Sequence, residues 1–459
     1  MDPRPIHAVA SAPPARPAGR ASSAGLSLRE RYLLLFLGMH APMAIALRAM
    51  ETVPRFHALG VLGLGVWWAT LGRRPAWAVA AAAYIAGAEI LWRMTGTGLF
   101  WEFGKYGAAL ILLLVFVHLP TRRTTYWGAL LYIVLLVPSA LITLQELGPT
   151  MAKDAISFNL SGPFSLAVAV LLFSSVQAAA IDVELVVYSL LAPTLGVLAV
   201  CSYSTLTAGA IRFYAESNYV TSGGFGPNQV SALLGLGALL SLLLSLQSTQ
   251  AWKRGLFLAL TLWFLVQGVL TFSRGGVINA VICIGFMMVH LVRQPRVRVA
   301  VLAILVFFTF LGATVILPRL NEYTGGALQE RYSSTSTGLR QTLVEEELAL
   351  WRENPVLGVG PGMSKYYRAG LLGIEVASHT EFTRLLSEHG TFGLLALLLL
   401  IGIAAVAYLR APSSLEKAWV ASLSGWSFIE MSHSAMRIVA ISLLFGLATI
   451  QWRRQGPSP

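Results

Sequence analysis

The chain contains few charged residues and few cysteines. Only 12% of its 459 residues are charged, and it contains 2 cysteines. Cys201 and Cys283 both fall within apolar runs, so we expect packed thiols rather than a disulfide or a metal site. So low a charged fraction lies outside the range of soluble globular domains. The composition therefore argues against a soluble protein.

Metal-binding and repeat patterns are also missing. The sequence has no HxxxH pair, no CxxC, no clustered Asp-x-Asp in a segment predicted outside, and no repeat of fixed period. We therefore expect no catalytic metal, no cofactor and no solenoid. The net charge is +12, but in a membrane protein the position of each basic residue matters more than the sum. Nucleic acid is accordingly not an expected partner.

Long apolar runs make up most of the chain. Hydrophobic residues make up 56% of the chain, and the mean hydropathy is +0.68. Taking about 20 apolar residues as one crossing predicts an all-α polytopic membrane protein with about 12 to 14 transmembrane helices, and so a lipid bilayer as partner. The predicted crossings are 32–47, 56–71, 76–92, 104–119, 126–144, 164–181, 184–202, 228–247, 255–272, 276–292, 299–317, 391–409, 415–431 and 436–452.

Composition shifts along the chain predict five regions. Residues 1–30 are rich in Pro, Ala, Ser and Arg and are expected to form a disordered cytoplasmic tail. The transmembrane bundle is predicted over 31–317, and a large helical periplasmic loop carrying the candidate catalytic histidine over 318–390. C-terminal transmembrane helices are predicted over 391–452, followed by a cytoplasmic tail over 453–459.

Basic residues between the crossings predict the orientation. If the N-terminus is cytoplasmic, alternation places every basic cluster on the cytoplasmic side, as the positive-inside rule requires. These clusters are Arg73 with Arg74, Arg122 with Arg123, Lys253 with Arg254, residues 293–298, Arg410 with Lys417, and Arg453 with Arg454. One turn, with Asp182 and Glu184, has no basic residue. Among the segments that then fall outside, three stand out: 203–228, 272–276 and 318–390. The outside loops before Phe164 and around Glu51 are less informative.

A histidine in the last of these segments is the first candidate for catalysis. It lies in the stretch SHTEFTRLLSEHGTFG, from Ser378 to Gly393. Ser378 and Glu381 have capping-box spacing, which predicts His379 as the first helical residue and Gly390 as the helix end. The positive end of the helix dipole would disfavour imidazolium and keep a neutral base available. The alternative is that His379 is an interfacial polar residue.

Two arginines in outside segments complete the candidate site. Arg274, in the turn TFSRGG, lies between two apolar runs, where a fixed charge either reaches the lipid headgroups or faces a cavity. Arg212 lies in 203–228, and its alternative is an interfacial anchor among aromatic residues. Two arginines can clamp a phosphate and a histidine can take a proton, which suits a diphosphate-linked donor.

These motifs carry a resemblance to a known family. His379-Thr380, nine residues, Gly390, two residues and Gly393 resemble the pattern H-[NSQ]-x9-G-x-x-G in the large periplasmic loop of the bacterial O-antigen ligase family. Thr380 stands where that pattern has Asn, Ser or Gln. Other stretches that look like the family are 340–360, Ser273-Arg274-Gly275 and Gly226-Pro227-Asn228-Gln229. The resemblance covers roughly the second half of the chain.

The resemblance implies a metal-independent glycosyltransferase of the bacterial inner membrane. Such an enzyme takes a glycan from undecaprenyl diphosphate on the periplasmic side and transfers it to an acceptor hydroxyl. By this resemblance the catalytic residues are His379, Arg274 and Arg212. The implied substrate-binding residues are Arg340, Asn228, Thr380 and Glu381.

The acceptor is left open by the motifs. The first interpretation is an O-antigen ligase acting on lipid A-core. The same chemistry would serve an O-antigen or exopolysaccharide polymerase that extends a growing glycan, or a protein O-oligosaccharyltransferase. Arg212 and Gly223 have an R-x10-G spacing that resembles the polymerases. A transporter of lipid-linked glycans is the alternative from another class, but it would be expected to carry ionisable residues in mid-helix, and the charges near apolar runs here cluster at predicted helix ends.

Overall fold

The computed structural model describes residues 26–119, 126–334, 339–373 and 375–452. Every regular element within these ranges is a helix, apart from one isolated bridge between Gln177 and Gln451. The predicted all-α class is therefore confirmed. The predicted tail 453–459, nearly all of the predicted tail 1–30, and the pair Arg122 and Arg123 lie outside the described residues.

Helix length and apolar composition make this a multi-pass membrane protein. Within lipid, backbone polar groups must bond inside their own segment, which is why the apolar runs are helices. Among the described residues, eight helices are long and apolar enough to cross: α3 (Pro75–Met94), α6 (Ala140–Phe173), α7 (Val183–Thr207), α8 (Pro227–Gln247), α9 (Ala251–Leu270), α10 (Arg274–Leu291), the segment Val301–Tyr323 and α16 (Glu381–Arg410). Shorter apolar helices are α4 (Phe103–His118), α5 (Trp127–Leu136) and α18 (Val439–Ala448). The remaining predicted crossings lie on α1 (Leu28–Arg48), α2 (Val53–Ala69) and α17 (Ser414–Ser434).

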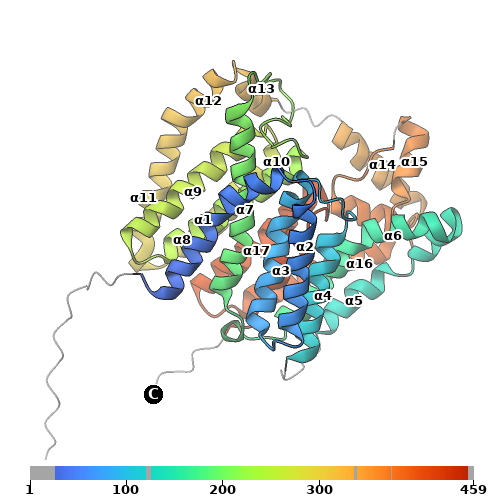
Figure 1. Cartoon of the computed structure of the whole chain (residues 1–459). Helices are drawn as coiled ribbons and strands as arrows, with labels where there is room; N and C mark the ends of the chain where they lie inside the picture. The colour runs from blue at the N-terminus through green and yellow to red at the C-terminus, as the bar shows by residue number, and fades with distance from the viewer. Residues whose placement is uncertain (1–25, 120–125, 335–338, 374, 453–459) are drawn as a thin grey trace, which may run out of the picture.

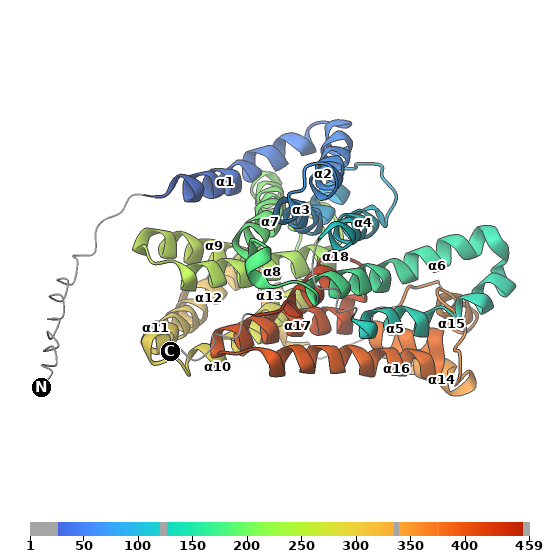
Figure 2. The same cartoon turned by 90° about the horizontal axis from the view of Figure 1, so that it is seen from below.

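Helices α5 and α6 form a hairpin that projects from the bundle (Figure 2). Its tip is Gly148, where φ is 70° and ψ is 167°, and Pro149 follows. The segment predicted as a loop before Phe164 is therefore helical. A glycine at positive φ turns the chain in one residue, so two long helical arms can follow each other with no loop between them. The projecting arms provide a surface on which part of the large loop rests.

The large loop is divided into two helical parts (Figure 1). The first continues the crossing α11 (Pro295–Leu311) through a π-helical turn, Gly312–Ile316, into α12 (Leu317–Tyr323), and α13 (Ala327–Ser333) follows. Pro318 lacks an amide hydrogen, and the π turn directly before it absorbs the disrupted bonding. The second part, α14 (Leu339–Glu353) and α15 (Ser364–Leu372), lies beside α6 and α16.

The three segments predicted outside meet at one end of the bundle. Oγ of Ser273 donates to Oδ1 of Asn228 (2.8 Å), and Nε of Arg331 donates to the carbonyl of Phe272 (2.9 Å). These bonds join 203–228, 272–276 and 318–390. Their convergence is what the charge alternation predicted, although the side of the membrane stays a prediction.

At the opposite end of the bundle lies the acidic turn with Asp182 and Glu184. This turn has no basic neighbour in the sequence, but it pairs with a distant arginine. Arg29 forms ion pairs with Asp182 (2.6 Å) and Glu184 (3.1 Å), and Lys253 pairs with Glu30. Asp182 also caps α7 by accepting from the amide of Leu185. The positive charge for this turn therefore comes from the start of α1, far away in sequence.

Candidate functional site

His379 lies directly before the cap of α16. Thr380 is the N-cap, because its hydroxyl oxygen accepts a hydrogen bond from the amide of Phe382 (3.2 Å) and the helix begins at Glu381. The prediction that Ser378 caps this helix with His379 at its first position is therefore wrong. Ser378 is not free to cap, because its hydroxyl faces a guanidinium nitrogen of Arg368 at 3.5 Å.

The surroundings of His379 keep its imidazole neutral. Burial is the largest cause that lowers the pKa of His379, and together with the charges of Arg437, Arg340, Arg368 and His433 it brings this pKa to about 4. Its Nδ1 is buried without a hydrogen-bond partner among the described residues. The imidazole is neutral, as predicted, but burial and neighbouring cations keep it so rather than the helix dipole. A neutral imidazole with a free nitrogen can accept a proton.

Arg274 is the first residue of α10 and reaches across to the large loop. Its Nη1 donates hydrogen bonds to the carbonyl oxygens of Arg331 (3.4 Å) and Ser334. Arg331 is close enough for the two guanidinium charges to interact. The predicted clamp residue therefore belongs to a pair of arginines, one from the short turn and one from α13.

Asn228 supports the turn that carries Arg274. Oγ of Ser273 donates to Oδ1 of Asn228 (2.8 Å), and Oγ of Ser231 donates to the carbonyl of Ser273 (2.8 Å). Phe272, just before, is held at a φ of 58°, a conformation that is costly for a residue with a β-carbon. These bonds from α8 hold the strained turn in place. Asn228 thus lies beside the site and positions Ser273.

Arg212 lies at the edge of this turn with its side chain exposed. Its carbonyl accepts from Nδ2 of Asn218 (3.2 Å). The next residue, Phe213, stacks on Phe272 with ring centroids 5.4 Å apart and planes at 22°. The structure therefore brings exposed Arg212 next to the turn of Arg274.

Arg340, at the start of α14, is electrostatically linked to the other predicted residues. Its charge interacts with those of Arg274, Arg437 and His379. Burial lowers the pKa of Arg340, and the repulsion from Arg274 lowers it further. We use the name cationic cluster for Arg274, Arg331, Arg340 and Arg437, which lie around His379 and His433.

The cationic cluster has few opposing carboxylates. Glu216 interacts with Arg331, and Glu430 lies 3.5 Å from Nε2 of His433. The ring of His433 lies against Gly275, where an added β-carbon would be 2.7 Å from Cε1 of the imidazole. Glycine is therefore required for this imidazole to lie beside the turn of Arg274. Mutual repulsion among the remaining cations would be relieved by a bound anion such as a diphosphate.

Sequence reasoning missed Arg331, Arg437 and His433. Arg437 and His433 lie in or beside the short turn between α17 and α18, which the charge alternation had placed outside. Arg331 lies within the large loop. A survey of basic residues in the predicted outside segments would have included Arg331 and His433, whereas Arg437 falls at the start of the predicted crossing 436–452. Nothing in the sequence alone says that they meet.

Thr380 and Glu381 have structural contacts in the described chain. The hydroxyl of Thr380 caps α16. Glu381 is 0% exposed, accepts hydrogen bonds from Arg384, and accepts from the amide of Met436 (3.2 Å). These bonds join α16 to the turn that carries Arg437. Both residues thus hold the backbone around His379.

A glycine-rich turn holds the other side of α16. Gly358, Gly360 and Gly362 have φ values of 67°, 95° and 82°. A β-carbon on Gly358 would lie 2.4 Å from the carbonyl carbon of Glu388, so the turn rests directly on the backbone of α16. Gly390, at a φ of 60°, breaks the helix there, as predicted. The glycines of the motif therefore serve close backbone contact.

The structure shows the state of both cysteines and the arrangement of possible metal ligands among the described residues. Cys201 and Cys283 are free and buried. Within the described ranges, His, Cys, Asp and Glu side chains form no group of three or more able to hold a metal ion.

Comparison with known proteins identifies the part of the chain that carries Arg274 and His379. Residues 258–398 match the family model described as O-antigen ligase. The matched stretch contains Arg274, Arg340 and His379 and ends before His433 and Arg437. The curated proteins contain no match to the chain. The chain is therefore a multi-pass membrane protein that carries a domain of the O-antigen ligase family, a family of membrane glycan-transfer enzymes.

Proposed function

We propose that the chain is a periplasmic-face glycosyltransferase of the bacterial inner membrane. It transfers a glycan from undecaprenyl diphosphate to an acceptor hydroxyl, and as an O-antigen ligase its acceptor is lipid A-core. The observation that carries the proposal is the neutral His379, whose Nδ1 has no hydrogen-bond partner in the described part of the chain, inside a cluster of arginines. One group is suited to accept a proton and the others to hold a diphosphate.

The reaction follows from these roles. Arg274, Arg340 and Arg437 hold the diphosphate of the donor, and exposed Arg212 adds its charge from the neighbouring edge. The acceptor oxygen forms a bond to the anomeric carbon while His379 takes the hydroxyl proton. The bond from that carbon to the phosphate oxygen breaks, and its electron pair leaves with the diphosphate. The arginines stabilise this charge without a metal ion.

An apolar cavity beside the cluster supports a lipid-linked donor. A hollow of about 560 Å3 lies between α9, α10 and the α11–α12 segment. Val269 and Leu320, which line it, also pack against Phe272, two residues before Arg274. A polyprenyl chain in this cavity would place its diphosphate next to Arg274. We call it the apolar chamber.

A polymerase is the second candidate, because one observation favours it. Gly223, which has the polymerase-like spacing from Arg212, has a φ of 70°, and its carbonyl accepts from Arg48 at 3.3 Å. A specific backbone conformation at this position agrees with a motif role. In that case the acceptor is a growing glycan. A protein O-oligosaccharyltransferase would use the same groups with a Ser or Thr acceptor.

Lipopolysaccharide from a strain lacking the gene tests the proposal. Core without any O-chain supports a ligase, whereas core carrying a single repeat supports a polymerase. Reconstitution of the purified protein with a lipid-linked glycan and each acceptor then measures transfer directly. Unchanged lipopolysaccharide together with no transfer to any acceptor would contradict the proposal.

A further inference from the structure

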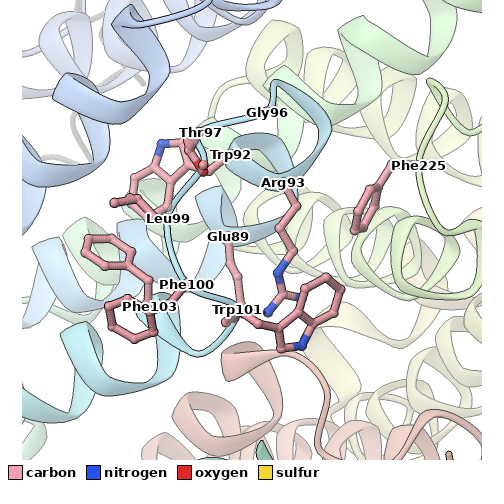
Figure 3. A pocket seen from close by; sticks show the side chains of 12 residues that line it. Glu89, Trp92, Arg93, Gly96, Thr97, Leu99, Phe100, Trp101, Phe103 and Phe225 are labelled. Carbon is pink, nitrogen blue, oxygen red and sulfur yellow. Dashed lines mark hydrogen bonds and ion pairs between the residues drawn. The ribbon is translucent and has the colours of Figure 1, made fainter. Parts of the chain in front are cut away.

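A second hollow, lined by aromatic rings, lies beside the cationic cluster (Figure 3). It has a volume of about 180 Å3 and lies between the end of α3, the start of α4 and the segment before α8. We call it the aromatic pocket, and its rings are those of Trp92, Phe100, Trp101, Phe103 and Phe225. None of the catalytic or substrate-binding residues predicted from the sequence lines the aromatic pocket.

The aromatic pocket also contains a buried ion pair. Nη2 of Arg93 lies 2.7 Å from Oε1 of Glu89, and the two side chains are 10% and 3% exposed. Cζ of Arg93 lies 3.9 Å from the ring centroid of Trp101, and Figure 3 shows the two groups together at the centre of the pocket. A niche that only faces lipid would not gain from charged groups, because ionisable side chains are costly there. Aromatic faces next to charged groups suit a ligand with both apolar faces and hydroxyl edges.

Arg93 connects the aromatic pocket to the candidate catalytic histidine. Its Nη1 donates to Oε1 of Gln229 (2.8 Å) and to the carbonyl of Arg437 (3.4 Å). Nη2 of Arg437 donates to the carbonyl of Ser378 (2.9 Å), the residue before His379. Two arginines therefore join the pocket to the site, which places a ligand in the pocket near the reacting groups.

The rim and floor of the aromatic pocket are already formed. Nε of Arg55 donates to the carbonyl of Thr97 (2.8 Å), which fixes the loop between Gly96 and Gly98. On the floor, an added β-carbon on Gly104 would lie 2.8 Å from Oε1 of Glu89. A pocket that exists before its ligand arrives has less ordering cost to overcome.

We infer that the aromatic pocket is a saccharide subsite of the proposed transferase. Trp101, 37% exposed, and Phe100, 58% exposed, offer ring faces for stacking, and Arg93 and Glu89 add polar groups to the same lining. The sugar belongs either to the acceptor or to the glycan of the donor. The inference depends on the proposed function, because only a glycan-transfer reaction brings sugars to this end of the bundle.

Steady-state kinetics of the full chain in nanodiscs test the subsite. The substrates are a lipid-linked glycan donor and lipid A-core, and the variants are Trp101→Ala, Trp101→Phe and Trp127→Ala. Trp127 is also exposed, at 75%, but lies at the start of α5, away from the cluster, and serves as the matched control. Loss of one stacking face should raise a KM by about three- to tenfold with kcat little changed. Trp101→Phe should lie nearer to wild type, and Trp127→Ala should equal it.

The rise in KM identifies the source of the sugar. A higher KM for lipid A-core indicates an acceptor sugar, and free core oligosaccharide should then inhibit the wild type more strongly than Trp101→Ala. A higher KM for the donor indicates its glycan, and free repeat oligosaccharide should show the same difference. If Trp101→Ala does not fold, Phe100→Ala provides the same comparison.

Unchanged KM values in folded Trp101→Ala would overturn the subsite while leaving the proposed function standing. If the wild type transfers no glycan, the proposed function fails instead. Saturation-transfer NMR then compares binding of the two free oligosaccharides to the wild type and Trp101→Ala. Binding that Trp101→Ala loses would support the subsite, and no binding to the wild type would overturn it.

Discussion

The amide of Ala435 donates a hydrogen bond to the carbonyl oxygen of His379 across 3.1 Å. Ala435 has a φ of 50° and a ψ of −164°, a conformation that costs a residue with a β-carbon on the order of 1–3 kcal/mol. Arg437 bonds the preceding carbonyl, that of Ser378. The turn after α17 therefore holds the backbone on both sides of the imidazole. Neither of these bonds uses the imidazole of His379.

Replacing His379 by Ala should abolish transfer with little effect on folding. Removal of a positioned base typically lowers the rate by about 10²- to 10⁴-fold. The backbone bonds to Ala435 and Arg437 do not need the imidazole. Transfer by purified protein and thermal unfolding in detergent measure the two effects. His118→Ala, an exposed histidine at the end of α4, should behave as wild type, and full activity in His379→Ala would exclude the base role.

The pH profile should reflect the low pKa of His379. A base acts when neutral, so kcat/KM should be flat from about pH 8 down to about pH 5.5 and fall as the pH approaches 4. An ordinary histidine would already lose activity near pH 6.5. The unfolded chain protonates first, so the contribution of His379 to stability is complete above about pH 6.5 and declines as the pH falls to about 4. An acid limb of kcat/KM at about pH 6.5 would contradict the assignment.

Arg274→Lys should not restore what Arg274→Ala loses. Lysine keeps the charge but cannot form the forked pair of hydrogen bonds that a guanidinium gives a phosphate. We expect both variants to lose about 10²- to 10³-fold in transfer, by analogy with removal of one oxyanion donor. Donor titrations measure the loss. Arg254→Ala, at the start of α9, is the control, and near-wild-type transfer by Arg274→Lys would show that charge alone suffices.

Gly358→Ala should weaken the protein more than a matched glycine substitution elsewhere. Gly358 has a φ of 67° and Gly325 a φ of 60°, so alanine meets similar backbone strain at both. Only at Gly358 does the new β-carbon meet backbone, 2.4 Å from the carbonyl carbon of Glu388, whereas nothing lies within 4 Å at Gly325. Thermal unfolding should show a larger loss for Gly358→Ala. Equal losses would mean that the glycine turn does not depend on this contact.

Transfer should continue after treatment with EDTA. In the proposed mechanism the arginines of the cationic cluster carry the charge stabilisation that a divalent ion supplies in other transferases. Transfer rates before and after chelation test this, with a metal-dependent transferase treated in parallel to show that chelation was complete. Loss of activity that added Mg²⁺ restores would overturn metal independence.

Most of the fold could be predicted because long apolar helices are recognisable from composition alone. A helix needs about 20 apolar residues to cross the bilayer, so each long apolar run predicts one crossing. The hairpin of α5 and α6 could not be predicted in this way, since Gly148 turns the chain without a polar loop. The ion pairs of Arg29 with Asp182 and Glu184 depend on helix packing that no local pattern encodes.

Several residues of the candidate site could be named from the sequence, but the physical causes of their properties could not. The spacing of His379, Gly390 and Gly393 identified the stretch, and charge alternation placed Arg274 at the same end. The neutral state of His379 was attributed to a helix dipole, whereas burial is the larger cause. His433 and Arg437 join the site only because α17 and α18 pack against α16, a tertiary relationship that the sequence does not express.

The apolar chamber has a consequence for the kinetics of the proposed reaction. One of its walls is the segment Val301–Tyr323, which has an 18-residue apolar window of which only 6% is buried inside the protein. A lipid-linked donor can therefore arrive, and the spent carrier depart, by sideways diffusion within the leaflet. Turnover then follows the mole fraction of donor among the membrane lipids rather than its concentration in the sample. Inert phospholipid slows such an enzyme by dilution in two dimensions, although nothing blocks the site.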